Sequence, residues 1–400
     1  MGFAGELRAL MATRGISGCA LARMVPCDKA LICRYRSGKQ APSAKMANRI
    51  DEVLGAGGDL AAIARAEAGP GRRSVLAGGL IAGALLGIGL EAADRLAWVA
   101  RHESHVDLAA VESLADVLAS ARHADDALGS AAMLRPALAQ LAVVENLVRQ
   151  AHGPVRPPLV HVAQQWAQFG GQLCRQAGDV AGARTCGAQA LEWAEELGDR
   201  TMISTLLVSR AYLAADAGEA GTMIGLAQGA QRDVRAAAGQ RADATGFEAR
   251  GHAMTGDSGA AERKLGEAHD LAAALAGRPQ DQRPWSYWLN PAVFMNEEGI
   301  TCAYLAGSSS RWHERAVALL TITPDETALW AAAKNLTWLA FAHAQAGDVG
   351  PACATAIEAS RAVRRTGSVP HAATLSQISA DLHGRCPGDR RVAELAGALA

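Results

Sequence analysis

Residues 21–43 read LARMVPCDKALICRYRSGKQAPS and contain two short helical segments separated by a turn. The first segment places three small or apolar residues on one helix face, Leu21, Ala22 and Val25. A second helix is predicted over residues 28–37 and ends at Gly38, because glycine suits the last position of a helix. The stretch therefore predicts two short helices joined by a tight turn, the second of them rich in cations.

The flanking residues extend this pair into a small helical module over residues 1–66. Leu7, Leu10 and Met11 have the spacing of one buried helix face. Ser17 has the residue type and position of an N-cap for the helix that follows it. Two further helices are predicted, at residues 44–54 and 60–65.

The charge of the chain is divided between this module and the rest. Residues 1–66 contain ten Lys or Arg and five Asp or Glu, a net charge of +5. The remaining residues contain 29 basic and 35 acidic side chains, a net charge of −6. A basic module on a mildly acidic body suits a nucleic-acid binder whose second part has another task.

The order helix, turn, helix, Gly-Lys and Pro-Ser resembles the XRE/Cro-type helix-turn-helix repressors, especially the N-terminal modules of actinobacterial regulators. This resemblance implies that Asp28 begins the recognition helix, that Lys29 and Ala30 face the bases, and that Arg34 reaches a guanine edge. Cys33 replaces the serine usual in the family. Phosphate contacts are implied for three more cations: Arg36, Lys39 and Arg23.

Residues 67–91 form an apolar, glycine-rich connector. No charged residue occurs over the 17 residues 74–90, and Gly79, Gly83 and Gly87 are spaced by four. Three interpretations are open: a buried or dimer-forming helix, which we favour, a membrane span of minimal length, and a disordered hinge. Membrane contact is therefore considered but not favoured.

Residues 92–400 repeat a helical pattern. A glycine that ends one helix precedes a capping residue and a new alanine-rich helix, and the glycines are separated by 40, 38, 51 and 40 residues: Gly178, Gly218, Gly256, Gly307 and Gly347. Residues 111–151 are expected to open the same array. The pattern is similar to the tetratricopeptide repeat, with Trp166 and Phe169 keeping part of its aromatic character. The expected fold is all-α, a helix-turn-helix domain followed by an α-solenoid.

A cluster of aromatic and amide side chains interrupts the array within RPWSYWLNPAVFMNEEG. Aromatic rings with amide neighbours suit the recognition of a peptide backbone, although the same rings can simply fill an irregular repeat interface. The candidate ligand-binding residues are Trp285, Tyr287, Trp288, Asn290, Asn296, Asn335 and Trp338.

No catalytic motif is found. The chain has no Gly-x-x-x-x-Gly-Lys phosphate loop and no Gly-x-Ser-x-Gly elbow, and the spacing of His102 and His105 is too short for a zinc protease helix. Its eight cysteines form no CxxC pair, and no metal site or cofactor is expected. Without a secretory signal, these cysteines indicate a reducing cytoplasm.

These observations favour a cytoplasmic, homodimeric transcriptional regulator that binds double-stranded DNA and senses a peptide or small-protein ligand through its repeats. The resemblance further implies that ligand binding changes the spacing of two DNA-binding heads. An interaction scaffold, with a head that reads no sequence and with or without a membrane tether, is the alternative. No enzymatic activity is expected.

Overall fold

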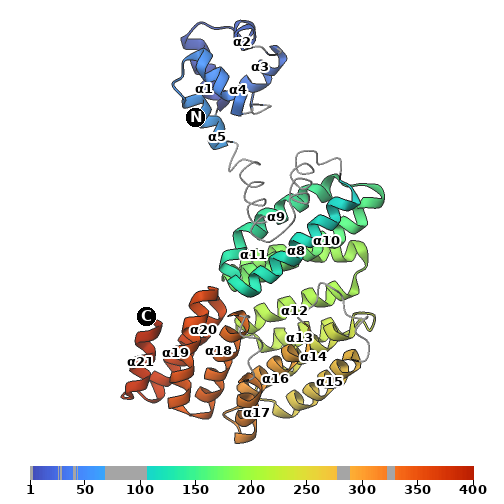
Figure 1. Ribbon diagram of the computed structural model, residues 1–400, viewed down its shortest axis with the longest axis vertical. Coiled ribbons are helices and arrows are strands. Elements are labelled where there is room, and N and C mark those ends of the chain that lie inside the picture. Colours follow the sequence, from blue (N-terminus) through green and yellow to red (C-terminus); the bar gives the residue numbers. More distant parts are fainter. Residues whose placement is uncertain are drawn as a thin grey trace. The chain divides into compact units, whose positions relative to one another are not determined.

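The computed structural model describes residues 3–25, 27, 29–38, 42, 44–67, 106–276, 289–321 and 329–400. Within these ranges the chain is all-α, with nineteen α-helices and no strand (Figure 1). It divides into two compact units, Met1–Gly78 and Gly79–Ala400. The favoured connector helix and the alternative membrane span of residues 74–90 fall outside the described residues.

Over its described residues, the first unit contains five helices around one apolar core. They are α1 (Phe3–Thr13), α2 (Gly18–Met24), α3 (Lys29–Arg36), α4 (Ala44–Leu54) and α5 (Asp59–Glu67). The core is formed by side chains that all five helices contribute, among them Leu7, Leu21, Ile32, Ile50 and Leu60. Each of these side chains is fully buried.

Local hydrogen bonds explain where these helices begin. The Ser17 hydroxyl accepts a bond of 3.2 Å from the amide of Ala20, so Ser17 is the predicted N-cap of α2. The buried carboxylate of Asp51 on α4 accepts bonds from the amides of Gly58 and Ala61, at 2.7 and 3.0 Å. Asp51 therefore ties α4 to the first turn of α5.

The second unit consists of paired antiparallel helices, consistent with a helical-repeat arrangement (Figure 1). Its helices are α8 (Leu108–Leu128), α9 (Ser130–Gln150), a short 3-10 helix η1 (Gly153–Val155), α10 (Arg156–Gln176), α11 (Val180–Leu197), α12 (Arg200–Asp216), α13 (Ala220–Gln231), α14 (Ala238–Met254), α15 (Ser258–Ala276), α16 (Pro291–Leu305), α17 (Ser310–Leu320), α18 (Leu329–Ala346), α19 (Val349–Thr366), α20 (Val369–Arg385) and α21 (Arg390–Leu399). From α10 to α19, each helix packs tightly on its pair, and the first helices of successive pairs also touch.

One turn recurs between the paired helices. Gly178, Gly218, Gly256 and Gly347 all have positive φ, between +74° and +85°, as predicted for glycines that end a helix. The next residue donates its amide to the carbonyl five positions earlier, for example Asp179 to Cys174 at 2.8 Å. Gly307 differs, because its φ is not positive. It allows a close approach instead, since a Cβ there would lie 2.8 Å from the Gln345 carbonyl oxygen.

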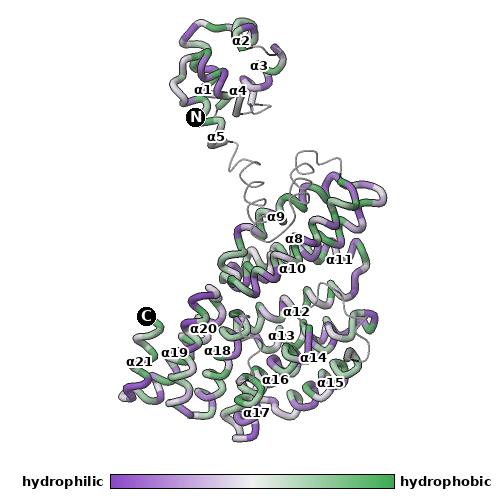
Figure 2. The backbone as a smooth tube through the Cα atoms, viewed as in Figure 1, coloured by the Kyte–Doolittle hydropathy of each residue, from purple (hydrophilic) through white to green (hydrophobic). Residues whose placement is uncertain are grey.

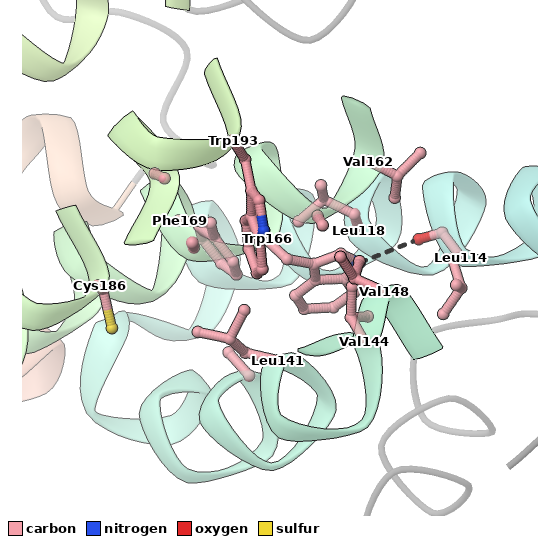
Figure 3. Close-up of a cluster of buried hydrophobic side chains, with 14 of the residues drawn as sticks. Leu114, Leu118, Leu141, Val144, Val148, Val162, Trp166, Phe169, Cys186 and Trp193 are labelled. Carbon is pink, nitrogen blue, oxygen red and sulfur yellow. Dashed lines mark hydrogen bonds between the residues drawn. The ribbon is translucent and has the colours of Figure 1, made fainter. Parts of the chain in front are cut away.

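A buried aromatic cluster holds the first pairs together (Figure 3). Trp166 on α10 is 1% exposed and donates its indole N–H to the Leu114 carbonyl on α8 at 3.2 Å. Its ring meets Phe169 edge to face, with centroids 6.4 Å apart. Hydrophobic and hydrophilic positions are interleaved along most helices of both units (Figure 2), as expected for helices that bury one face.

The two ends of the repeat array are in contact. The turn between α19 and α20 packs against the turns that follow α8 and α10. A Cβ added to Gly129 would lie 2.7 Å from Thr366 Cα, and one added to Gly367 would lie 2.6 Å from Ala131 Cβ. Because both glycines also have positive φ, no other residue fits these turns without strain. The last helices of the array therefore contact its first helices, and the array is closed rather than open-ended.

Helix α9 is the one helix in the described ranges that is long and apolar enough to cross a membrane, by length and composition alone. About one third of its apolar window is buried, at 33%. It packs against α8 and α10 and contains Pro136.

Candidate functional site

Helix α3 has one buried face and one exposed face. Ile32 and Tyr35 are 0% and 4% exposed and belong to the core of the first unit. Lys29, Cys33 and Arg34 are exposed. Because residues four apart lie one above the other on a helix, Lys29 and Cys33 share one face, and Arg34 lies beside them. The structure therefore presents three of the predicted DNA-binding side chains together.

The other predicted DNA-binding residues lie in different surroundings. Arg23 is exposed on α2 and donates from Nε to the Cys19 carbonyl at 3.4 Å. Arg36 is half-buried and lies along the start of α2, where a Cβ on Gly18 would be 3.2 Å from its Nη1. Ala30 lies in α3, but the structure does not describe its side chain. Asp28 and Lys39 fall outside the described residues.

The second unit contains a cavity of about 150 Å³. Its wall is formed by α8, α10, α11, α12, α14, α16 and α18. Aromatic rings and charges of both signs line it, including Phe169, Arg175, Tyr212, Asp243, Trp330 and Lys334. A concave site with apolar surface and a few placed polar groups has the composition of a ligand pocket.

Hydrogen bonds fix the polar side chains of this wall. Arg175 donates to the Asp216 carboxylate at 2.8 Å, and its guanidinium lies 4.7 Å from the centre of the Tyr212 ring. The Tyr212 hydroxyl donates to Glu297 Oε1 at 3.2 Å. These contacts join α10, α12 and α16 through one chain of polar groups.

A buried ion cluster lies beside the cavity. Glu297 on α16 contacts Lys334 Nζ on α18, and its other carboxylate oxygen lies 3.7 Å from Arg250 Nη1 on α14. All three side chains are at most 6% exposed. Burial alone would raise the pKa of Glu297, but the two cations outweigh burial and lower it. Glu297 is therefore held as a carboxylate that neutralises one of its two cationic neighbours.

Burial also changes the pKa of two acids on the cavity wall. Desolvation, reinforced by the charge of Glu297, raises the pKa of Asp243 to about 7. Desolvation raises the pKa of Asp125 to about 6, although the hydrogen bond from Ser130 opposes the rise. These carboxyl groups change charge more readily near neutral pH than ordinary aspartates do.

Four buried polar atoms around the cavity and the ion cluster have no hydrogen-bond partner among the described residues. They are Arg250 Nε, Asn296 Oδ1, Glu297 Oε2 and Trp330 Nε1. Buried polar groups in folded proteins are nearly always bonded, so atoms of this kind mark a place for water or a ligand. They cluster on α14, α16 and α18, three of the helices that form the cavity wall, although Trp330 alone among the four residues lines the cavity itself.

The predicted ligand-binding residues are only partly brought together. Asn296 on α16 donates from its side-chain nitrogen to the side-chain oxygen of Asn335 on the facing helix α18, and both residues are buried. Trp338 is 7% exposed, and the Arg250 guanidinium lies 4.7 Å from its ring centre. Asn290 is engaged in capping α16, accepting from the Val293 amide at 3.2 Å. The last three, Trp285, Tyr287 and Trp288, fall outside the described residues.

Residues that line the cavity were not among the predicted ligand-binding residues, although the sequence contains a signal for them. The helices of the wall contain buried polar side chains where a purely structural helix has apolar ones, such as Gln240 and Asp243 on α14. Such residues are rarely buried unless they are bonded to one another or to a ligand. A search for polar residues on the inward face of each first helix would have found them.

A comparison with known proteins finds no matching family model and no similar sequence among curated proteins.

Proposed function

We propose that this protein is a sequence-specific DNA-binding transcriptional regulator of the cytoplasm. Its head is an XRE-type helix-turn-helix domain formed by α1–α5, and its body is a tetratricopeptide-like sensor of a peptide ligand. The observation that carries the proposal is the exposed face of α3, where Lys29 and Arg34 stand opposite the buried Ile32 and Tyr35.

The chemistry of this face suits a DNA duplex. A helix fits the major groove, where a planar guanidinium such as that of Arg34 can donate two parallel bonds to a guanine edge. Lys29 stands at the start of α3, the end of a recognition helix that reaches the bases in this class of domain. The net charge of +5 over residues 1–66 favours association with the phosphate backbone.

The cavity of the second unit supports the sensor half of the proposal. A peptide offers amide donors and acceptors along its backbone, and Gln168, Gln172 and Gln240 on the cavity wall carry side-chain amides of the complementary kind. The unbonded atoms on Arg250, Glu297 and Trp330 match the same requirement. Regulation requires that the ligand bind one conformation of the protein better than another.

Selection of bound fragments from genomic DNA tests both halves of the proposal. The full chain is incubated with sheared DNA, with and without extract from the producing cells, and bound fragments are sequenced. We expect a common sequence motif and a change in occupancy on adding extract. Arg34→Ala should erase the preference at one base position, at a cost of about 1–3 kcal/mol for the preferred site.

Arg49→Ala is the matched control, because Arg49 is an exposed arginine of the same unit on α4 rather than α3. It should preserve the motif and weaken binding to all sequences equally, if at all. An Arg34 variant with unchanged sequence preference would contradict the proposed reading helix. If no fragment is enriched, the interaction scaffold becomes the better account of the chain.

A further inference from the structure

Two histidines and one aspartate meet where α17 contacts the turn between α18 and α19. His313 Nε2 lies 3.0 Å from His343 Nδ1 and 3.6 Å from Asp348 Oδ2. One ligand atom from each residue lies within 4.8 Å of the other two. His313 belongs to α17, His343 to α18, and Asp348 occupies the position just before the first residue of α19.

The turn between α18 and α19 fixes the backbone positions of His343 and Asp348 relative to each other. The amide of Asp348 donates to the His343 carbonyl at 2.9 Å. The same bond joins Asp257 to His252 at 3.0 Å in the turn between α14 and α15. His343 and Asp348 therefore occupy positions that the fold specifies, and His313 is added to them from the preceding pair of helices.

The Asp348 carboxylate does not cap its own helix. In other turns, the capping aspartate accepts from the amide three residues later, as Asp257 does from Ala260 at 2.9 Å. Asp348 makes no such bond, because the residue three positions later is Pro351, which has no N–H. Its carboxylate is thereby left to face His313.

We propose that His313, His343 and Asp348 form a binding site for Zn²⁺ or a similar borderline divalent transition metal. Zinc binds histidine nitrogen and carboxylate oxygen at about 2.0–2.2 Å in tetrahedral geometry, which places neighbouring ligand atoms roughly 3.3 Å apart. The observed separations of 3.0 and 3.6 Å bracket this value. Imidazole with one carboxylate is a donor set that suits zinc rather than calcium or magnesium.

The surroundings leave room for metal entry and for a fourth ligand. The Asp348 side chain is 50% exposed and that of His313 is 17% exposed, so the group opens to solvent on the aspartate side. A water molecule would complete the tetrahedron. The bound ion would link α17 to the turn between α18 and α19.

Zinc titration of the full chain tests this site. Protein freed of metal by a chelator is titrated with ZnCl₂ by calorimetry, and its thermal unfolding is followed with and without the metal. We expect wild-type protein to bind one ion at this site and to unfold at higher temperature when loaded. His313→Ala and Asp348→Asn should each weaken the affinity about tenfold or more.

Two further variants control for folding and for adventitious binding. Pro351→Ala removes no ligand atom but restores an amide that competes for Asp348, so it should also weaken zinc binding. His252→Ala alters the equivalent position of another turn, where Asp257 is committed to capping, and should bind zinc as wild type does. Cobalt bound in place of zinc should show no thiolate charge-transfer band, because no cysteine belongs to the site.

The proposal is overturned if wild-type protein takes up no zinc. It is equally overturned if His313→Ala and Asp348→Asn bind zinc as tightly as wild type, or if the cobalt spectrum shows cysteine ligands. The three side chains would then form a hydrogen-bonded chain without a metal.

Discussion

Ser368 and Gln176 lie 192 residues apart in the sequence, yet the Ser368 hydroxyl donates a hydrogen bond of 2.6 Å to Gln176 Oε1. His371 Nδ1 lies 2.8 Å from the same hydroxyl oxygen. Burial, with nearby cations, lowers the pKa of His371 to about 3, so this imidazole is neutral. Because the single hydroxyl hydrogen of Ser368 goes to Gln176, His371 donates to Ser368 from Nδ1. The contact joins the last pair of helices to α10 through two consecutive hydrogen bonds.

Substitution of Gly367 tests how much this closure stabilises the second unit. Gly367→Ala should destabilise that unit more than Gly347→Ala does. Both glycines have positive φ, but an added Cβ meets nothing within 4 Å at Gly347 and the Ala131 Cβ at 2.6 Å at Gly367. The difference should be on the order of 1–3 kcal/mol. Urea unfolding followed by tryptophan fluorescence measures it, since all eight tryptophans follow residue 91. Equal losses would mean that the closing contact is not rigid.

Loss of Glu297 should expose the cost of a buried charge that has no partner. Glu297→Gln removes the carboxylate that lies between the buried cations Lys334 and Arg250, and should lower the free energy of unfolding by about 3–5 kcal/mol. Adding Lys334→Met should restore part of that loss, because one buried cation then remains in place of two. Arg390→Met is the contrasting variant: it breaks an ion pair whose arginine side chain is 91% exposed, and should change stability little. A double variant no more stable than Glu297→Gln would contradict this account.

The raised pKa of Asp243 predicts a pH dependence with a definite sign. Between its ordinary pKa of 3.8 and its folded value of about 7, the folded state holds a proton that the unfolded state has lost. The contribution of Asp243 to stability is therefore fully present below pH 3.8 and is lost as pH rises through about 7, at up to about 1.4 kcal/mol per pH unit. Asp243→Asn lacks this dependence.

Urea unfolding of wild-type and Asp243→Asn proteins at pH 5, 6 and 7 measures the effect. The free energy of unfolding of wild type, relative to the variant, should fall as pH rises over this range. Titrations common to both proteins cancel in the difference. A difference independent of pH would show that Asp243 is ionised throughout.

Salt dependence separates the proposed phosphate contacts from the base contacts. For a selected DNA site, Arg23→Ala should weaken binding to all sequences and reduce the slope of log K against log salt concentration by about one. Arg34→Ala should instead act on sequence preference. Fluorescence anisotropy at several salt concentrations gives both slopes. An unchanged slope for Arg23→Ala would remove Arg23 from the phosphate-binding surface.

Local patterns predicted the helices and their turns well. Residues 44–54 were predicted as a helix, and α4 has these bounds. Ser17 caps α2 as predicted, and Gly178, Gly218, Gly256 and Gly347 end helices with positive φ. These features depend on residues within about one helical turn of each other, so short sequence windows contain the information.

Contacts between residues far apart in the sequence could not be predicted from such local patterns. The bond between Ser368 and Gln176 has no local signature, because it depends on the angle that each pair of helices adds to the array. The cavity depends on that curvature too. No metal site was expected, since His313 and Asp348 belong to no short motif, although Pro351 after a Gly-Asp turn is a visible departure from the other repeats.

The contact between the two ends of the array limits how this protein can change in evolution. An open solenoid can gain or lose one helical pair, since each repeat touches only its neighbours. Here an inserted or deleted pair would displace Gly367 from Ala131 and Ser368 from Gln176. The number of pairs is therefore fixed by the closure, and new ligand specificity would have to arise by substitution on the inner helices rather than by repeat duplication.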